Sequence, residues 1–208
     1  MEMAAIDFIY FDMGKVIFEF DHDIACRKIG ELTGTSAGEI KSIIFESGLE
    51  DRYETGLLDS DQFYNEFLKA SGVEIGKDDF LGAIADVFWP NQKIFPLIAQ
   101  LRARNFPIGL LSNTCKAHFD FVCERYLIMR DFFSPVIVSY EVNSMKPDSK
   151  IYERALEQAG CHISNCFFVD DKQENVDGAI AAGMDAVLYR SVPELVEDLV
   201  KRGVAINF

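Results

Sequence analysis

The residues of this chain that could carry chemistry stand at or just beyond the ends of short apolar runs. They are single or paired carboxylates, a hydroxyl next to an amide, and a lysine: Asp12, Ser112 with Asn113, Lys146, and Asp170 with Asp171. If the runs are parallel strands of one sheet, the loops that carry these residues meet at one edge of that sheet. The sequence therefore predicts a single site built from four distant segments.

This set of groups fits phosphoryl transfer. A carboxylate can act as a nucleophile and form an acyl phosphate. Other carboxylates can hold Mg²⁺, which prefers oxygen ligands, while the hydroxyl, the lysine and backbone N–H groups can bind phosphoryl oxygens. Mg²⁺ would also relieve the repulsion among Asp12, Asp170 and Asp171 and between them and an anionic substrate. We therefore expect Mg²⁺ as the cofactor and a small phosphorylated molecule as the substrate.

The elements that must position these residues follow a βα rhythm. Each apolar run is solid rather than alternating, which is typical of strands that are covered on both faces. Stretches with helical periodicity lie between the runs. We expect strands over residues 6–11, 107–111, 135–138, 166–169 and 186–189, and helices over 92–104, 116–126, 149–159, 176–182 and 192–201.

The stretch from about residue 21 to residue 89 breaks this rhythm, because it shows helical patterns only. Several of these begin with Asp or Ser and end with Gly, which are the start and stop signals of short helices. An insert at this point would lie over the carboxyl end of the first strand, where open α/β sheets bind ligands. We predict an α/β fold: a Rossmann-like parallel sheet core of residues 1–17 and 91–208, with a helical cap of residues 18–90 inserted after strand one.

Four motifs carry a resemblance to a known family: "FDMGKVI", "LLSNT", "MKPDSKIYERAL" and "FFVDDKQENVDGAIAAGM". In this order and spacing, they make the chain resemble the haloacid dehalogenase (HAD) superfamily, in the phosphatase branch with a helical cap after strand one. Within that branch the chain is similar to the bacterial group whose first motif reads Asp-Leu-Gly-Asn-Val, exemplified by a glucose-1-phosphate phosphatase. The "YETG" at residues 53–56 also resembles the cap of that group.

The resemblance implies a role for each site residue. Asp12 would be the nucleophile, and Ser112, Asn113 and Lys146 would hold the phosphoryl group. Mg²⁺ would bind to Asp12, to the carbonyl of Gly14 and to Asp171. Asp170 and Asn175 would lie next to these ligands, without binding the ion themselves, and would orient them.

The chain departs from the family pattern at Gly14. Most phosphatases of the family have a second Asp there, which protonates the leaving group and then activates water. Glycine suits the turn but cannot transfer a proton, and such transfer is typically worth about 10²–10⁴-fold in rate. We therefore expect slow hydrolysis of ordinary alkyl phosphates. A substrate with an acidic leaving oxygen would lose less, such as an anomeric sugar phosphate, an aryl phosphate or an acyl phosphate.

Some residues near these motifs have an ordinary structural explanation as well as a functional one. His118 lies on a helix that starts near the site, although a lone histidine is more often structural. Arg52, Tyr53 and Glu54 in the cap could face the site, or could end a helix with a solvated charge pair.

Two other functions stay open on the residues alone. A 2-haloacid dehalogenase would also use an aspartate nucleophile and would need no acid at Gly14, because halide leaves unprotonated. Asp170 and Asp171 argue against it, since that reaction needs no metal. A ligand-binding relative without turnover is the other alternative, although the retained Asp12 and Lys146 argue against it.

Composition limits the binding partners and the cellular location that we expect for this protein. The net charge of −14 disfavours nucleic acid and anionic membrane surfaces as partners, because both attract basic proteins. No apolar run approaches the length of a membrane span and no signal peptide is evident. The five cysteines form no CxxC pair, which favours free thiols in a reducing compartment. We expect a cytoplasmic protein, and the sequence leaves its oligomeric state open.

Overall fold

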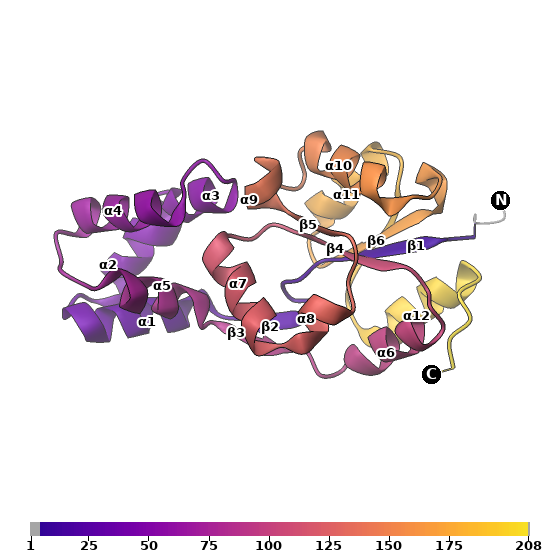
Figure 1. Cartoon of the computed structure of the whole chain (residues 1–208), viewed down its shortest axis with the longest axis horizontal. Helices are drawn as coiled ribbons and strands as arrows, with labels where there is room; N and C mark the ends of the chain where they lie inside the picture. The colour runs from indigo at the N-terminus through magenta and orange to yellow at the C-terminus, as the bar shows by residue number, and fades with distance from the viewer. Residues whose placement is uncertain (1–4, 208) are drawn as a thin grey trace.

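The computed structural model describes residues 5–207 and has a five-stranded parallel sheet at its centre (Figure 1). The strand order is β5-β4-β1-β6-β7, and every neighbouring pair is parallel. The strands are β1 (Phe8–Phe11), β4 (Ile108–Ser112), β5 (Val136–Val138), β6 (Cys166–Asp170) and β7 (Asp185–Leu188). The predicted α/β class is confirmed, and all five predicted strands are present, with ends that differ by one or two residues.

The register of the sheet brings the carboxyl ends of β1 and β6 level with each other. Phe11 pairs with Leu110 on one side and with Val169 on the other. Asp12, directly after β1, and Asp170, the last residue of β6, therefore lie side by side at one edge of the sheet. All four residues of β1 are buried between two neighbouring strands, which explains why its sequence shows no polar alternation.

Helices cover both faces of the sheet (Figure 1). Successive strand residues point to opposite faces, so Phe168 belongs to the hydrophobic core on one face and Phe167 to the core on the other. The Phe168 face is covered by α10 (Ser149–Ala159) and α11 (Gln173–Ala181). The Phe167 face is covered by α6 (Phe95–Ala103), α7 (Lys116–Arg125), α8 (Leu127–Asp131) and α12 (Val192–Lys201).

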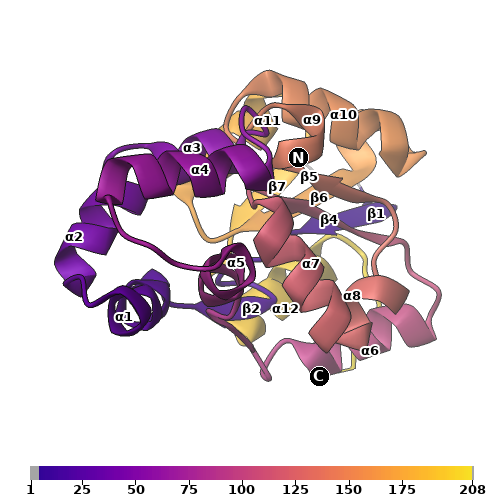
Figure 2. The same ribbon diagram turned by 60° about the vertical axis from the view of Figure 1, so that its left-hand side comes forward.

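A helical insert follows β1 and lies beyond the carboxyl edge of the sheet (Figures 1 and 2). Its two connections to the sheet domain are paired as antiparallel strands, β2 (Phe18–Phe20) and β3 (Phe88–Pro90). We call residues 22–85 the insert. They form α1 (His22–Thr33), α2 (Ala37–Lys41), a π-helical turn (Ser42–Glu46), α3 (Leu49–Glu54), α4 (Ser60–Ser71) and α5 (Lys77–Ala85).

The insert has an aromatic core of its own, which explains how it can hold its shape beside the sheet. Phe63 lies between Tyr53 and Phe80, with ring centroids 4.4 and 5.3 Å away. Phe67 stacks on Phe80 at 4.4 Å. These rings are fully or almost fully buried, and buried aromatic pairs add stability beyond their buried area.

The sequence did not predict several of the short elements. They include β2, β3, α8 and α9 (Ser139–Val142), each of three to five residues. Elements this short contain too few residues to show a period of 2 or 3.6.

The described residues include no helix that is long and apolar enough to cross a membrane. All five cysteines are free thiols.

Candidate active site

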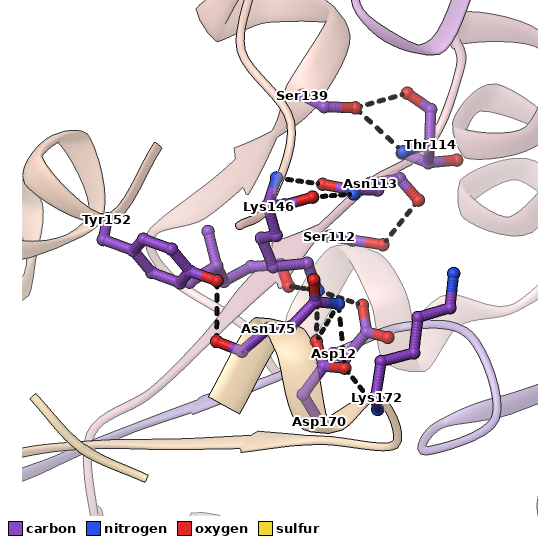
Figure 3. A network of polar contacts seen from close by, with 11 residues as sticks. Asp12, Ser112, Asn113, Thr114, Ser139, Lys146, Tyr152, Asp170, Lys172 and Asn175 are labelled. Carbon is purple, nitrogen blue, oxygen red and sulfur yellow. Dashed lines mark hydrogen bonds and ion pairs between the residues drawn. The ribbon is translucent and has the colours of Figure 1, made fainter. Parts of the chain in front are cut away.

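The centre of the site is a buried ion cluster formed by Lys146 and two aspartates (Figure 3). The Lys146 ammonium lies 2.8 Å from Oδ1 of Asp12 and 2.6 Å from Oδ2 of Asp170. It also donates to the carbonyl of Leu111 at 2.9 Å, so all three of its hydrogens can be used. These charges come from three segments that are more than 20 residues apart in the chain, and the parallel sheet brings them together.

Asp170 and its neighbour Asp171 have different surroundings. Asp170 is fully buried, and its carboxylate accepts from Lys146, from the backbone N–H of Lys172 and from the side-chain amide of Asn175. Asp171 is partly exposed and lies on the wall of a cavity. Asp170 is therefore held in place by the protein, whereas Asp171 faces the space that a ligand can enter.

The aspartates fit a divalent cation. One carboxylate oxygen from each of Asp12, Asp170 and Asp171 can be chosen so that all three lie within 4.8 Å of one another. The Nδ2 group of Asn175 donates to Asp170, which fixes the amide orientation, and its Oδ1 is buried without a partner among the described residues. A buried unpaired oxygen is costly, and a water bound to a cation would supply the missing donor.

Asn113 holds the loop that carries Lys146. Its side-chain oxygen accepts from the backbone N–H of Lys146 at 2.7 Å, and its side-chain nitrogen donates to the carbonyl of Lys146 at 2.9 Å. Both polar atoms of the side chain are therefore engaged within the protein. Ser112 is fully buried, and its hydroxyl lies 3.3 Å from the carbonyl oxygen of Asn113.

The hydroxyl of Ser139 joins the loop after β4 to the insert. It accepts from the backbone N–H of Thr114 at 2.9 Å and lies 2.6 Å from the backbone carbonyl of Glu54, to which it can donate. The insert is also attached to the sheet domain by Tyr53, whose hydroxyl accepts from the backbone N–H of Ala117. These contacts place the end of α3 over the site.

The turn after Asp12 differs from the prediction in one respect. The residue with a positive φ is Lys15, at 58°, whereas Gly14 is not among the positive-φ residues of the described chain. Glycine fits position 14 for a different reason. A Cβ there would lie 2.8 Å from Cε1 of Phe20, which is closer than real contacts allow.

The site opens into a cavity of about 220 Å³ between the sheet edge and the insert. The sheet domain and its connections contribute Asp12, Gly14, Phe20, Asn113, Lys146, Asp171, Lys172 and Asn175, and the insert contributes His22, Glu50, Asp51 and Glu54. Of the insert residues, the sequence had pointed only to Glu54. Glu50 lies one helical turn before Glu54 and could have been found from that spacing.

Burial changes the proton affinity of several groups in this cavity. It raises the pKa of Asp12 to about 7, although the Lys146 charge acts in the opposite direction. Burial likewise raises the pKa of Glu54 to about 7, opposed by Lys172 and Lys146. It lowers the pKa of His118 to about 3. Burial thus favours the neutral forms of Asp12, Glu54 and His118, as expected where few counter-charges compensate for lost hydration.

Of the other residues named from the sequence, Arg52 and Tyr53 lie outside the cavity, whereas His118 of the sheet domain lines it. Arg52 is exposed and forms an ion pair with Glu66, away from the cavity. The ring of Tyr53 is buried in the aromatic core of the insert. His118 is buried on α7, at the contact with the insert.

The fold and the site define an α/β protein with an aspartate–lysine centre at the carboxyl edge of a parallel sheet and a helical insert above it. The chain belongs to the haloacid dehalogenase-like hydrolases, because the model of that family matches residues 9–183.

Several known proteins are similar to this chain. It is 29% identical over 189 residues to the pyrimidine 5′-nucleotidase YjjG of Escherichia coli (strain K12), covering 86% of this chain and 83% of that protein. A HAD-like family hydrolase from Porphyromonas gingivalis has a similar structure, with a TM-score of 0.81 and 23% identity, covering 94% of this chain and 98% of that one. A HAD family enzyme from Bacteroides thetaiotaomicron, solved with magnesium and inorganic phosphate, aligns with a TM-score of 0.77 and 21% identity, over 90% of this chain and 96% of that one.

Proposed function

We propose that this hydrolase cleaves a small phosphomonoester with the help of Mg²⁺, through a phosphorylated form of Asp12. The observation that carries the proposal is the position of Asp12, which lies at the cavity wall between the Lys146 ammonium and the Asp171 carboxylate. Similarity to a pyrimidine 5′-nucleotidase and to an enzyme solved with magnesium and phosphate supports the same class of substrate.

In this proposal, each residue acts on a stated part of the substrate. The backbone N–H of Asn113 binds a phosphoryl oxygen, and Lys146 binds another once its ammonium exchanges its contact with Asp12 for the phosphate. The Ser112 hydroxyl lies beside them once it turns from its present partner. Asp12, the carbonyl of Gly14 and Asp171 hold Mg²⁺, while Asp170 and Asn175 fix the positions of Lys146 and of the water around the ion. When bound, Mg²⁺ supplies positive charge that offsets the carboxylates and the substrate phosphate.

The chemical steps then follow from Asp12. One of its oxygens attacks phosphorus, the bond from phosphorus to the ester oxygen breaks, and the leaving alkoxide takes a proton from solvent. Water then attacks the acyl phosphate and releases inorganic phosphate, which returns the Asp12 carboxylate. Because Gly14 cannot donate a proton, the first step favours leaving groups that are already acidic, such as an anomeric sugar hydroxyl or a phenol.

The cavity limits the size of the substrate. Its volume of about 220 Å³ is smaller than the roughly 300–1,000 Å³ of pockets for drug-sized ligands. Several of its groups can hydrogen-bond to hydroxyls, including those of His22 and Lys172. A small polyhydroxylated phosphate, such as a sugar phosphate, fits both properties.

The test is a phosphate-release screen with Mg²⁺ across sugar phosphates, nucleotides, and aryl and acyl phosphates. We expect release that stops with EDTA, returns with Mg²⁺ and is absent in Asp12→Asn. The matched control is Asp51→Asn, an exposed carboxylate at the rim of the same cavity, which should keep the chemistry. Release of chloride from 2-chloropropionate without any phosphate release would contradict the proposal and favour a dehalogenase.

A further inference from the structure

A second group of potential metal ligands lies where the insert meets the sheet domain. Glu50 and Glu54 are one helical turn apart on α3, so they point to the same side of that helix. His118 comes from α7 on the sheet domain. One ligand atom from each of the three can be chosen so that all lie within 4.8 Å of one another. We call these three residues the bridging cluster.

Glu50 has an oxygen that the protein leaves without a partner. The residue is only 7% exposed, and its Oε1 is buried without a hydrogen bond among the described residues. The other oxygen, Oε2, lies 3.7 Å from Nδ1 of His22, but burial lowers the pKa of His22 to about 4, so this imidazole is neutral near pH 7 and brings no compensating charge. A buried carboxylate oxygen without a partner is strongly unfavourable, so a bound cation would stabilise the fold by supplying the partner that Oε1 of Glu50 lacks.

The hydrogen bond of His118 to the backbone leaves its other ring nitrogen available to bind a metal ion. Its Nε2 lies 3.1 Å from the carbonyl oxygen of Ile84. A carbonyl can only accept, so Nε2 carries the hydrogen and Nδ1 keeps a free lone pair. The same arrangement is found in metal-binding histidines, which donate from one ring nitrogen to a carbonyl or a carboxylate and bind the metal with the other.

We propose that the bridging cluster of Glu50, Glu54 and His118 binds a second divalent cation of the zinc type, which links the insert to the sheet domain. One imidazole and two carboxylates suit Zn²⁺, whereas Mg²⁺ prefers oxygen ligands only. Ligand bonds of about 2.0–2.2 Å in a tetrahedral site require the three side chains to move closer together than the cluster now holds them. A fourth position stays open toward the cavity, with His22 nearby.

The consequence concerns the insert. Because two ligands belong to α3 and one to α7, the cation would resist separation of the insert from the sheet domain (Figure 2). It would also neutralise two carboxylates on the wall that faces the phosphate-binding groups. The proposal rests on this cluster alone and does not depend on the reaction proposed above.

The test is a titration of the full chain, stripped of metal, with Zn²⁺ and in parallel with Co²⁺ in the presence of saturating Mg²⁺. We expect one Zn²⁺ per chain by calorimetry and a visible Co²⁺ spectrum from imidazole coordination. His118→Gln keeps an N–H for the Ile84 carbonyl but lacks the second ring nitrogen, and Glu50→Gln keeps the shape without the charge. Each should weaken Zn²⁺ binding about tenfold or more, since even losing an outer-shell partner typically costs about 10–100-fold.

Two control variants make the outcome decisive. Asp51→Asn removes a neighbouring cavity carboxylate outside the cluster and should leave the Zn²⁺ affinity unchanged. Asp171→Asn alters the other carboxylate group and should also keep the Zn²⁺ site. In the wild type, Zn²⁺ should slow hydrogen exchange in β2 and β3, and this effect should be absent in His118→Gln. The proposal is overturned if no Zn²⁺ binds under saturating Mg²⁺, or if Asp171→Asn removes the binding while folded His118→Gln and Glu50→Gln retain it.

Discussion

Replacing Gly14 with aspartate should restore the missing proton donor, but only if Phe20 is changed as well. A Cβ at position 14 would lie 2.8 Å from Cε1 of Phe20, about 0.6 Å closer than the 3.4 Å at which ordinary contact begins. The ring cannot move freely, because it also contacts Lys15, His22 and Phe88, with 4.6, 4.9 and 5.5 Å to the ring centroid. The single variant Gly14→Asp should therefore lose about 1–3 kcal/mol of stability, which is the usual cost of overpacking.

Phe20→Leu provides the matching change. A leucine ends at the δ carbons, and the ring carbon at that level, Cδ1, is 3.4 Å from the new Cβ. Phe20→Leu alone should cost less than about 1.5 kcal/mol. The double variant should be more stable than the sum of the two single changes indicates, because the clash is present only in Gly14→Asp. Urea unfolding of the four proteins measures this coupling.

The catalytic readout is the dependence of kcat/KM on the leaving group. Across a series from p-nitrophenyl phosphate to alkyl phosphates, we expect a steep decline for the wild type and a shallow one for Gly14→Asp/Phe20→Leu. The gain on alkyl phosphates should approach the 10²–10⁴-fold that acid catalysis typically contributes, which is about 3–5 kcal/mol of barrier. The reasoning is refuted if the wild type is as insensitive to the leaving group as the double variant, or if stability shows no coupling between positions 14 and 20.

Three further predictions concern stability. Lys146→Met leaves Asp12 and Asp170 buried without their cation, so it should cost about 3–5 kcal/mol at pH 7, and urea unfolding should show part of that loss recovered as falling pH protonates the carboxylates. Asn113→Ala removes two hydrogen bonds to the backbone of Lys146, and we expect a loss of about 1–3 kcal/mol with weaker phosphate binding by calorimetry; unchanged binding would contradict the positioning role of Asn113. Burial lowers the pKa of His118 to about 3, whereas the pKa of a histidine in the unfolded chain is about 6.5. As pH falls below about 6.5, protonation of His118 in the unfolded chain therefore removes stability, by about 2 kcal/mol at pH 5. In EDTA, His118→Gln should lose less stability between pH 7 and pH 5 than the wild type does.

The strands and their order along the chain could be predicted because burial on both faces leaves a mark in the sequence. A run such as Phe8–Phe11 is apolar at every position, and the residue after it is placed at the sheet edge by the parallel topology alone. The convergence of Asp12, Lys146 and Asp170 follows from the same argument. The distances of 2.6–2.8 Å from the Lys146 ammonium to the two carboxylates could not be predicted, because they depend on how each side chain packs.

Other features depend on contacts that the local sequence does not encode. The sequence predicted a phosphate-binding role for Asn113 but not that its side chain bonds to a backbone 33 residues away. Gly14 was explained by the turn, whereas the positive φ belongs to Lys15 and the glycine makes room for Phe20. Glu50 was missed because a glutamate on a short helix usually faces solvent, whereas tertiary packing buries this one.

The Ser139 hydroxyl couples the structure of the cavity to the position of the insert. The same oxygen bonds to Thr114, next to Asn113, and to the backbone of Glu54. If the insert swings away, this oxygen loses its contact with Glu54, and its hydroxyl hydrogen is left with the carbonyl of Thr114, 3.0 Å away, as its acceptor. The order of the loop that carries Asn113 is thereby coupled to docking of the helices above it, so a substrate that steadies either part favours the arrangement of both.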